Sequence, residues 1–266
     1  MTNPFTDKTR LQEQYRDGTN LAARAALHAR FTTAPRPWTA WVFDHLALPR
    51  DARVLEIGCG TGGLWRSNRE RIPAAWQLTL TDFSLGMVET TRATGVAANF
   101  AQTDAQQIPF CDAAFDAVIA NHMLYHVPDL PRALAEIRRV LKPGGMLFAA
   151  TNGTDHMREL DALVTQFLGG EPFQRQLTFH RDNGRAILAP YFPNARWIEY
   201  PDTLVVTETE PLVAYAMSGF IGKQIIGSKR ENALREFVAA RIARDGAIRI
   251  TKASGLFIAE GQISNL

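Results

Sequence analysis

The stretch at residues 54–64 constrains the fold of this chain more than any other part of the sequence. It reads Val-Leu-Glu-Ile-Gly-Cys-Gly-Thr-Gly-Gly-Leu. Its apolar residues Val54, Leu55 and Ile57 are typical of a buried strand in a parallel sheet. The glycines that follow let the backbone turn tightly and approach a ligand where a Cβ atom would collide. The pattern therefore predicts a strand, a glycine loop and the start of a helix.

The spacing of these glycines fits two kinds of nucleotide-binding loop. Gly58, Gly60 and Gly63 match the dinucleotide fingerprint G-x-G-x-x-G. With Gly62 as the third glycine, the same loop reads G-x-G-x-G. Glu56 precedes the loop, and we expect it to point toward the loop's mouth. A carboxylate there would repel a diphosphate but suit a cation without phosphate, such as S-adenosylmethionine with its sulfonium and amino groups. The sequence favours the cation.

Length and composition are those of a globular protein with one large α/β domain, with or without an inserted cap. Of the 266 residues, 46% are hydrophobic and 21% charged, which is ordinary for a chain with a full core. The formal net charge of +2 is too small to imply a nucleic acid or an anionic membrane as partner. Two cysteines, Cys59 and Cys111, indicate neither a disulfide framework nor a metal site. No secretory signal or long apolar run is present, so we expect a cytoplasmic protein.

Residues 1–50 precede the glycine loop and are expected to be helical in pieces. Apolar residues recur at helical spacing in residues 11–15, 21–31 and 38–46. We interpret this segment as an N-terminal helical arm, which either packs on the surface or acts as a lid over the cofactor pocket. Tyr15 and His28 are the side chains of the arm that we consider for the site.

From residue 52 onward, strand and helix patterns alternate, which predicts a parallel sheet with helices on both faces. Strands are expected after the glycine strand at residues 76–81, 98–103, 115–120 and 146–151, with a helix at residues 131–141.

Two of these strands end in an acid. Asp82 lies 19 residues after Gly63, close to the spacing at which a carboxylate meets the ribose of a bound nucleoside; capping of a helix together with Ser84 is the alternative. Asp104 can accept a hydrogen bond from an adenine amino group, or can simply form the turn before Pro109. Because the carboxyl ends of parallel strands converge, we expect both acids to border the same pocket as Glu56.

The pattern loosens after residue 154. Residues 155–190 are predicted to be helical with a polar break, residues 196–206 to form one extended strand, and residues 210–222 and 229–244 to form helices. Residues 247–251 and 255–259 alternate like strands around a turn at 252–254. We assign residues 51–154 and 191–266 to a core domain, and segments of about 155–190 and 208–245 to an inserted helical cap that covers the acceptor site.

These motifs together resemble the class I S-adenosylmethionine-dependent methyltransferases, in particular the small-molecule branch with a type 11 methyltransferase domain. The resemblance covers about residues 54–151. It rests on Val-Leu-Glu-Ile-Gly-Cys-Gly-Thr-Gly, Asp82, Asp-Ala-Gln-Gln-Ile-Pro-Phe from 104, Phe-Asp-Ala-Val from 115, His-Val-Pro-Asp from 126 and Leu-Lys-Pro-Gly-Gly from 141. It implies a Rossmann-like, seven-stranded, mostly parallel sheet whose last strand is antiparallel.

The resemblance also implies a set of cofactor-binding residues. Glu56, Gly58 and Gly60 would lie beside the methionine part of S-adenosylmethionine, and Asp82 would bind the ribose. Phe83 and Met87 would flank the adenine. The full set that we expect to bind S-adenosylmethionine, or the product S-adenosylhomocysteine, is Tyr15, Glu56, Gly58, Cys59, Gly60, Asp82, Phe83, Met87, Asp104, Ala105, Gln106 and Asn121.

The predicted function is methyl transfer to a small-molecule acceptor by in-line displacement. Positioning and desolvation can supply most of the acceleration, and a general base is needed only if the acceptor must lose a proton. The candidates are His122, Tyr125 and His126, after the strand at 115–120. No metal, nucleic acid or membrane is expected to take part, and the chain would act as a monomer or homodimer. The alternatives are a non-catalytic module that binds S-adenosylmethionine and, against the evidence of Glu56, an NAD(P)-dependent oxidoreductase.

Overall fold

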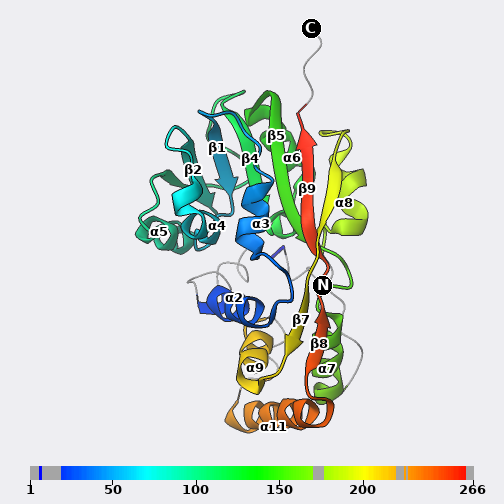
Figure 1. Cartoon of the computed structure of the whole chain (residues 1–266). Coiled ribbons are helices and arrows are strands. Elements are labelled where there is room, and N and C mark those ends of the chain that lie inside the picture. Colours follow the sequence, from blue (N-terminus) through cyan, green and yellow to red (C-terminus); the bar gives the residue numbers. More distant parts are fainter. Residues whose placement is uncertain (1–5, 8–18, 170–176, 220–224, 226, 262–266) are drawn as a thin grey trace.

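The computed structural model describes residues 6–7, 19–169, 177–219, 225 and 227–261. Seven strands form the main sheet in the order β3-β2-β1-β4-β5-β9-β6 (Figure 1). Their bounds are β1 Arg53–Ile57, β2 Gln77–Asp82, β3 Asn99–Gln102, β4 Phe115–Asn121, β5 Leu141–Asn152, β6 Arg196–Tyr200 and β9 Ser254–Glu260.

The directions of the strands agree with the expected class. Strands β1 to β5 pair in parallel, whereas β9 runs antiparallel to both β5 and β6. The antiparallel strand is therefore the last in the chain and lies between β5 and β6. This confirms the Rossmann-like, seven-stranded, mostly parallel sheet.

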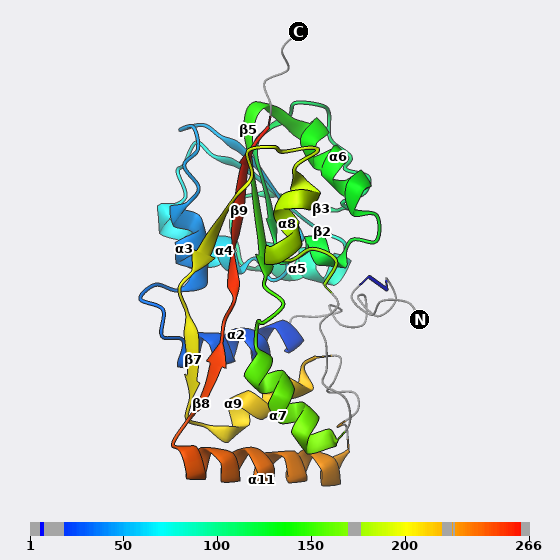
Figure 2. The ribbon, with the colours of Figure 1, turned by 90° about the vertical axis from the view of Figure 1, so that its right-hand side faces the viewer.

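Helices cover both faces of the sheet because alternate strand residues are apolar on both sides. Leu55 and Ile57 of β1 share a buried cluster with α6 (Leu130–Val140) and α8 (Arg181–Leu188). Val54, on the opposite face, shares a second cluster with α3 (Trp38–Asp44) and α4 (Gly63–Ser67). Figure 2 shows α3 and α6 on opposite sides of the sheet. Helix α5 (Leu85–Ala93) follows β2.

A smaller unit, which we call the cap, lies at the end of the sheet where β4 and β5 finish (Figures 1 and 2). Strands β7 (Thr203–Val206) and β8 (Ile248–Thr251) form a separate antiparallel pair in it. Its apolar cluster includes residues from α2, α7, α9, α11 and both strands. The helices are α2 Thr19–Phe31, α7 Arg158–Leu168, α9 Thr209–Met217 and α11 Ser228–Asp245.

The structure corrects three parts of the predicted organisation. The single strand predicted at 196–206 is two strands in different sheets, because Pro201 cannot donate a hydrogen bond and the chain leaves the main sheet there. Residues 247–251 and 255–259 do not form a hairpin, since β8 pairs with β7 and β9 with β5 and β6. Helix α8, predicted within the cap segment 155–190, packs on the main sheet, whereas β7 and β8, predicted in the core, belong to the cap.

The N-terminal arm also differs in its placement. Leu27 and Phe31 of α2 are buried in the apolar cluster of the cap, while α3 packs on the main sheet. The helical piece predicted at residues 11–15 lies outside the described residues. Every helix in the described part of the chain is too short or too polar to span a bilayer.

Candidate functional site

A cavity of about 1230 Å³ lies between the carboxyl ends of the core strands and the cap. The glycine loop and the ends of β2 and β4 line one half of it, and α2, α7, α9 and the link between β8 and β9 line the other. The structure brings together here every sequence-predicted site residue that it describes; Tyr15 alone lies outside the described residues. The residues brought together are Glu56, Gly58, Cys59, Gly60, Asp82, Phe83, Met87, Asp104, Ala105, Gln106, Asn121, His122, Tyr125 and His126.

The glycine loop needs its glycines for conformation and for space. Gly58 has φ of +71°, and a Cβ atom there would lie 2.8 Å from the Cβ of Met123. Gly62 has φ of +69°, and a Cβ atom would lie 2.8 Å from Cγ2 of Thr91. Both positions combine the left-handed region with a close neighbour, so alanine would be strained at either.

Asp82 connects the glycine loop to the start of α5. One carboxylate oxygen accepts from the backbone N–H of Gly60 at 2.9 Å, and the other accepts from that of Ser84 at 2.9 Å. Ser84 is also the N-cap of α5 and accepts from the N–H of Met87. Burial raises the pKa of Asp82, and backbone hydrogen bonds from Ser84, Gly60 and Phe83 oppose that shift. Ser84 therefore caps the helix, as the alternative interpretation expected. Asp82 accepts from the backbone N–H of Ser84 and also lines the cavity.

Glu56 is more enclosed than the sequence suggests. It is 2% exposed, and its two carboxylate oxygens accept from Trp65 Nε1 at 2.6 Å and from Asn121 Nδ2 at 3.2 Å. Burial raises the pKa of Glu56 to about 7, against the effect of those two hydrogen bonds. We expected an open carboxylate at the loop's mouth. The carboxyl group is instead buried against the side chains of Trp65 and Asn121.

Asn121 provides an acceptor beside Glu56. Its side-chain oxygen is buried and has no hydrogen-bond partner in the part of the chain that the structure describes. A buried amide oxygen without a partner is costly, so a donor group on a ligand would stabilise it.

Asp104 begins the turn after β3. Its Oδ1 accepts from the backbone N–H of Gln106 at 3.0 Å and from the side-chain amide of the same residue at 2.8 Å. The turn predicted as an alternative is therefore present, and it leaves both residues in the cavity wall.

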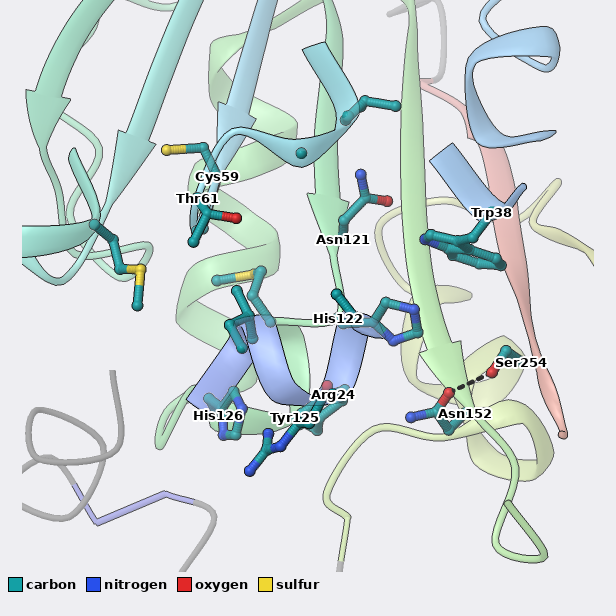
Figure 3. Close-up of a pocket in the computed structure, with 18 of the residues that line it drawn as sticks. Arg24, Trp38, Cys59, Thr61, Asn121, His122, Tyr125, His126, Asn152 and Ser254 are labelled. Carbon is teal, nitrogen blue, oxygen red and sulfur yellow. Dashed lines mark hydrogen bonds between the residues drawn. The ribbon is translucent and has the colours of Figure 1, made fainter. Parts of the chain in front are cut away.

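His122 follows directly after β4 and extends into the cavity near Trp38 (Figure 3). Its backbone has φ of +52°, and its N–H donates to the carbonyl of Ala150 in β5 at 3.1 Å. The centroids of the His122 and Trp38 rings are 5.1 Å apart. Burial, followed by the charges of Lys252 and His126, lowers the pKa of His122 to about 4. His122 is therefore an uncharged imidazole at neutral pH.

Tyr125 and His126 lie one turn further on, in the short 3₁₀ helix η2 (Leu124–His126). Their rings contact each other edge to face with centroids 4.5 Å apart. Both side chains line the cavity, and Figure 3 shows them beyond His122, on the far side from Cys59 and Thr61 of the glycine loop.

The cap contributes cavity residues that sequence reasoning missed. Lys252, in the link between β8 and β9, forms an ion pair with Asp202, in the link between β6 and β7, at 2.6 Å. Ser254 hydroxyl donates to Asn152 at 2.8 Å and lies 3.3 Å from His156 Nδ1. These residues are far apart in the chain and belong to no motif, so only the folded cap reveals them. His28 was considered from the sequence, and it also lines the cavity.

The strand order, with one antiparallel strand between β5 and β6, and the glycine loop joined to an acid at the end of β2, agree with the Rossmann-like fold that the resemblance to class I S-adenosylmethionine-dependent methyltransferases implied. Comparison with known sequences agrees, because residues 55–149 match the family model described as a methyltransferase domain. The matched stretch lies in the main-sheet part of this chain, which is thus similar to that family. Within the described residues, no group of three His, Cys, Asp or Glu side chains could hold a metal ion.

Two proteins that are similar to this chain in sequence are methyltransferases with different acceptors. The malonyl-[acyl-carrier protein] O-methyltransferase of Erwinia pyrifoliae is 34% identical over 134 residues, which are 50% of this chain and 50% of that protein. The demethylmenaquinone methyltransferase of Renibacterium salmoninarum is 36% identical over 133 residues, or 50% of this chain and 55% of that protein. The chain thus matches little more than half the length of these curated relatives.

Solved structures share the fold at lower identity. Phosphoethanolamine N-methyltransferase 2 of Haemonchus contortus, solved with S-adenosylhomocysteine, has a TM-score of 0.59 and 18% identity over 97% of this chain and 60% of that one. The [4+2]-cyclase SpnF has a TM-score of 0.56 and 21% identity over 96% of this chain and 97% of that one. At this identity the likeness concerns the fold alone.

Proposed function

We propose that this chain transfers the methyl group of S-adenosylmethionine to a small-molecule acceptor held between the core and the cap. The proposal rests on the hydrogen bonds that backbone amides of the glycine loop donate within the chain. The backbone N–H groups of Cys59, Gly60 and Gly62 donate to Thr81 carbonyl, the Asp82 carboxylate and Cys59 carbonyl. A dinucleotide fold uses such amides for the diphosphate, but here they have partners within the chain. This supports a nucleoside ligand without a diphosphate.

The residues of the core half fit S-adenosylmethionine. The backbone N–H groups of Gly60 and Ser84 donate to different oxygens of Asp82, and a carboxylate with about four lone-pair sites retains capacity for the ribose hydroxyls. The buried oxygen of Asn121 has no partner among the residues that the structure describes and can accept from the amino group of the methionine part. Glu56, beside it, becomes a better partner for that cation when it loses its proton. We therefore propose these three residues as the polar contacts of the ligand.

The chain's own contribution to the reaction would be positioning and exclusion of water. S-adenosylmethionine supplies an activated methyl group on a sulfonium, which becomes neutral when the methyl group leaves. The end of β4 would hold the acceptor, with His122 against it, and the cap would cover both ligands. His122, Tyr125 and His126 remain the residues that we propose to contact the acceptor.

The test is transfer of label from methyl-labelled S-adenosylmethionine to a fraction of small metabolites, with Asp82→Ala as the matched control. We expect a labelled product with the wild-type chain and a strongly reduced amount with the variant. Binding of S-adenosylmethionine without transfer to any fraction would support the non-catalytic alternative. The proposal would be wrong if the chain bound NAD instead.

A further inference from the structure

One arginine in the cap half of the cavity keeps hydrogen-bond donors for a ligand. Arg24 of α2 lines the cavity (Figure 3). Its Nε–H group donates to the hydroxyl of Ser218 at 3.1 Å, and one N–H group of Nη2 donates to the carbonyl of Ser218 at 2.8 Å. A guanidinium has further N–H groups on Nη1 and Nη2. Those of Arg24 have no partner among the residues that the structure describes.

The contacts with Ser218 hold the guanidinium in one orientation. Ser218 is 5% exposed, follows α9 directly, and donates its hydroxyl hydrogen to the carbonyl of Tyr215 at 2.7 Å. It therefore offers lone pairs to Arg24, along the edge of the guanidinium that Nε and Nη2 form. The other edge, formed by Nη1 and Nη2, presents parallel N–H groups whose spacing matches the two oxygens of a carboxylate. Capping of the end of α9 accounts for the first edge and leaves the second to a ligand.

The positive charge of Arg24 is also available, because no carboxylate in the described part of the chain accepts a hydrogen bond from it. Lys252, in the same half of the cavity wall, is paired with Asp202 at 2.6 Å. Asp161 of α7 has an interaction partner of its own. Several arginines of the cap that lie outside the cavity wall do have acids, namely Arg30 with Glu208, Arg235 with Glu231 and Arg241 with Asp245, each at 2.6 Å.

The surroundings of Arg24 indicate which kind of anion it would bind. Aliphatic surface comes from Ala25 of α2, from Leu160 and Val164 of α7 and from Ala216 of α9. His28, one turn along α2, adds no charge at neutral pH, because burial, followed by the charge of Lys252, lowers its pKa to about 3. A carboxylate matches the single charge of Arg24. A phosphate monoester, with a charge of about −2, would place an unpaired charge in this wall.

We propose that Arg24 forms a subsite for a carboxylate, and that the acceptor carries this carboxylate on an apolar body. The carboxylate oxygens would accept from the Nη1 and Nη2 edge of Arg24, and the apolar body would lie against the aliphatic side chains of α2, α7 and α9. The inference rests on the proposed methyl transfer and adds to it the residue that selects the acceptor. Arg24 would bind and position the acceptor without taking part in bond making or in proton transfer.

The test compares three probes with the same alkyl chain: octanoate, octanamide and octylamine. At neutral pH the first is an anion, the second is uncharged and the third is a cation. Their affinities are measured by calorimetry for the full chain saturated with S-adenosylhomocysteine, whose uncharged thioether adds no attraction for an anion. We expect octanoate to bind about tenfold more tightly than octanamide, the gain expected for a charge-assisted hydrogen bond, and octylamine to bind most weakly. The inference is overturned if octanamide or octylamine binds as tightly as octanoate, or if none of the three binds.

Substitutions assign the preference to Arg24. Arg24→Gln removes the charge and the guanidinium edge, so octanoate should bind about tenfold more weakly while the affinity for octanamide stays unchanged. Arg24→Lys keeps the charge without the paired N–H groups and should lose part of the preference. Arg66→Gln is the matched control, because Arg66 is an exposed arginine of α4 that lines the core half of the same cavity. It should leave the preference for octanoate intact.

Two results with the variants would overturn the inference. One is an undiminished preference for octanoate in both Arg24→Gln and Arg24→Lys. The other is an equal loss in Arg66→Gln, which would show a general effect of cavity charge. The proposed function fails separately, since a chain that does not bind S-adenosylhomocysteine would contradict methyl transfer. Binding of S-adenosylhomocysteine without a preference for octanoate would contradict the carboxylate subsite alone.

Discussion

Asp82 is the residue on which the core half of the cavity depends most directly. Its two carboxylate oxygens bind the amides of Gly60 and Ser84, so a single side chain fixes the glycine loop relative to α5. The same oxygens face the cavity. An acid in this place both shapes the loop and offers acceptors to a diol.

The first prediction concerns that acid. Asp82→Ala should weaken S-adenosylmethionine binding by roughly 1.5 to 3 kcal/mol, the loss expected for hydrogen bonds to a charged group. Titration calorimetry measures the change, with Asp112→Ala as control because its side chain is 78% exposed. Unaltered affinity in Asp82→Ala would contradict the assignment of the ribose contact.

A second prediction follows from the raised pKa of Glu56, which is about 7 in the folded chain. A cation bound nearby favours the ionised carboxylate and so lowers this pKa. Binding should therefore release a proton below about pH 7, and affinity should rise by up to about tenfold per pH unit until the pH passes 7 and then level off. Calorimetry in buffers of different ionisation enthalpy measures the released proton.

Glu56→Gln is the matched control for this pH dependence. The amide keeps the shape of the side chain and cannot ionise, so its affinity should be lower and level across the same pH range. A wild-type affinity that does not change between pH 5.5 and 8 would show that the cation lies away from Glu56.

At the scale of single residues, the sequence predicts the core half of the cavity well and the cap half poorly. Glu56, Asp82 and Asn121 stand at fixed spacings around strands whose ends must converge, so their neighbourhood follows from the parallel sheet. The electrostatic state of Glu56 does not follow, because it depends on Trp65, which reaches it through the packing of α4. Lys252 was predicted only as part of a turn, and its pairing with Asp202 follows from no local pattern.

At the scale of the elements, the links between core and cap are held by one buried ion pair. Asp202 lies between β6 and β7, and Lys252 lies between β8 and β9. Oδ1 of Asp202 also accepts from Thr32 hydroxyl at 2.7 Å and from the backbone N–H groups that follow α2. The pair therefore joins both strand crossings and the end of α2.

The third prediction tests this junction. Asp202→Asn keeps an acceptor oxygen but leaves the buried lysine without its countercharge, which should lower the free energy of unfolding by about 3 to 5 kcal/mol. Adding Lys252→Met should recover part of that loss, because the unpaired charge is gone. Denaturant titration of both variants and of Lys252→Met alone measures the coupling, and additive effects would contradict it.

The same junction explains why the element boundaries were predicted only in part. The strand-like pattern of residues runs through 196–206 without a break in hydrophobicity, so it predicts a strand for the residues of both β6 and β7. Which sheet each half joins depends on partners about 50 residues away, in β8 and β9. Local periodicity carries no information on that pairing. The strands β1 to β4 were placed to within about two residues, because each lies in a repeated unit of strand and helix, whereas β5 begins five residues before the predicted strand at 146–151.

At the scale of the whole molecule, the cavity lies where the main-sheet domain meets the cap. The matched family region, residues 55–149, supplies the glycine loop and the ends of β2 and β4. The cap, built from α2, α7, α9, α11, β7 and β8, supplies the opposite wall. Similarity to methyltransferases of different acceptors therefore bears on the core half, and acceptor choice would depend on the cap.

The central claim is that the core half binds a nucleoside with a sulfonium or thioether and not a dinucleotide. Titration calorimetry of the wild-type chain with S-adenosylmethionine, S-adenosylhomocysteine and NAD tests it directly. We expect both sulfur nucleosides to bind with one site per chain and NAD to give no binding heat, because the backbone amides of Cys59, Gly60 and Gly62 already donate within the chain. Saturable binding of NAD, with no heat from either sulfur nucleoside, would contradict the claim.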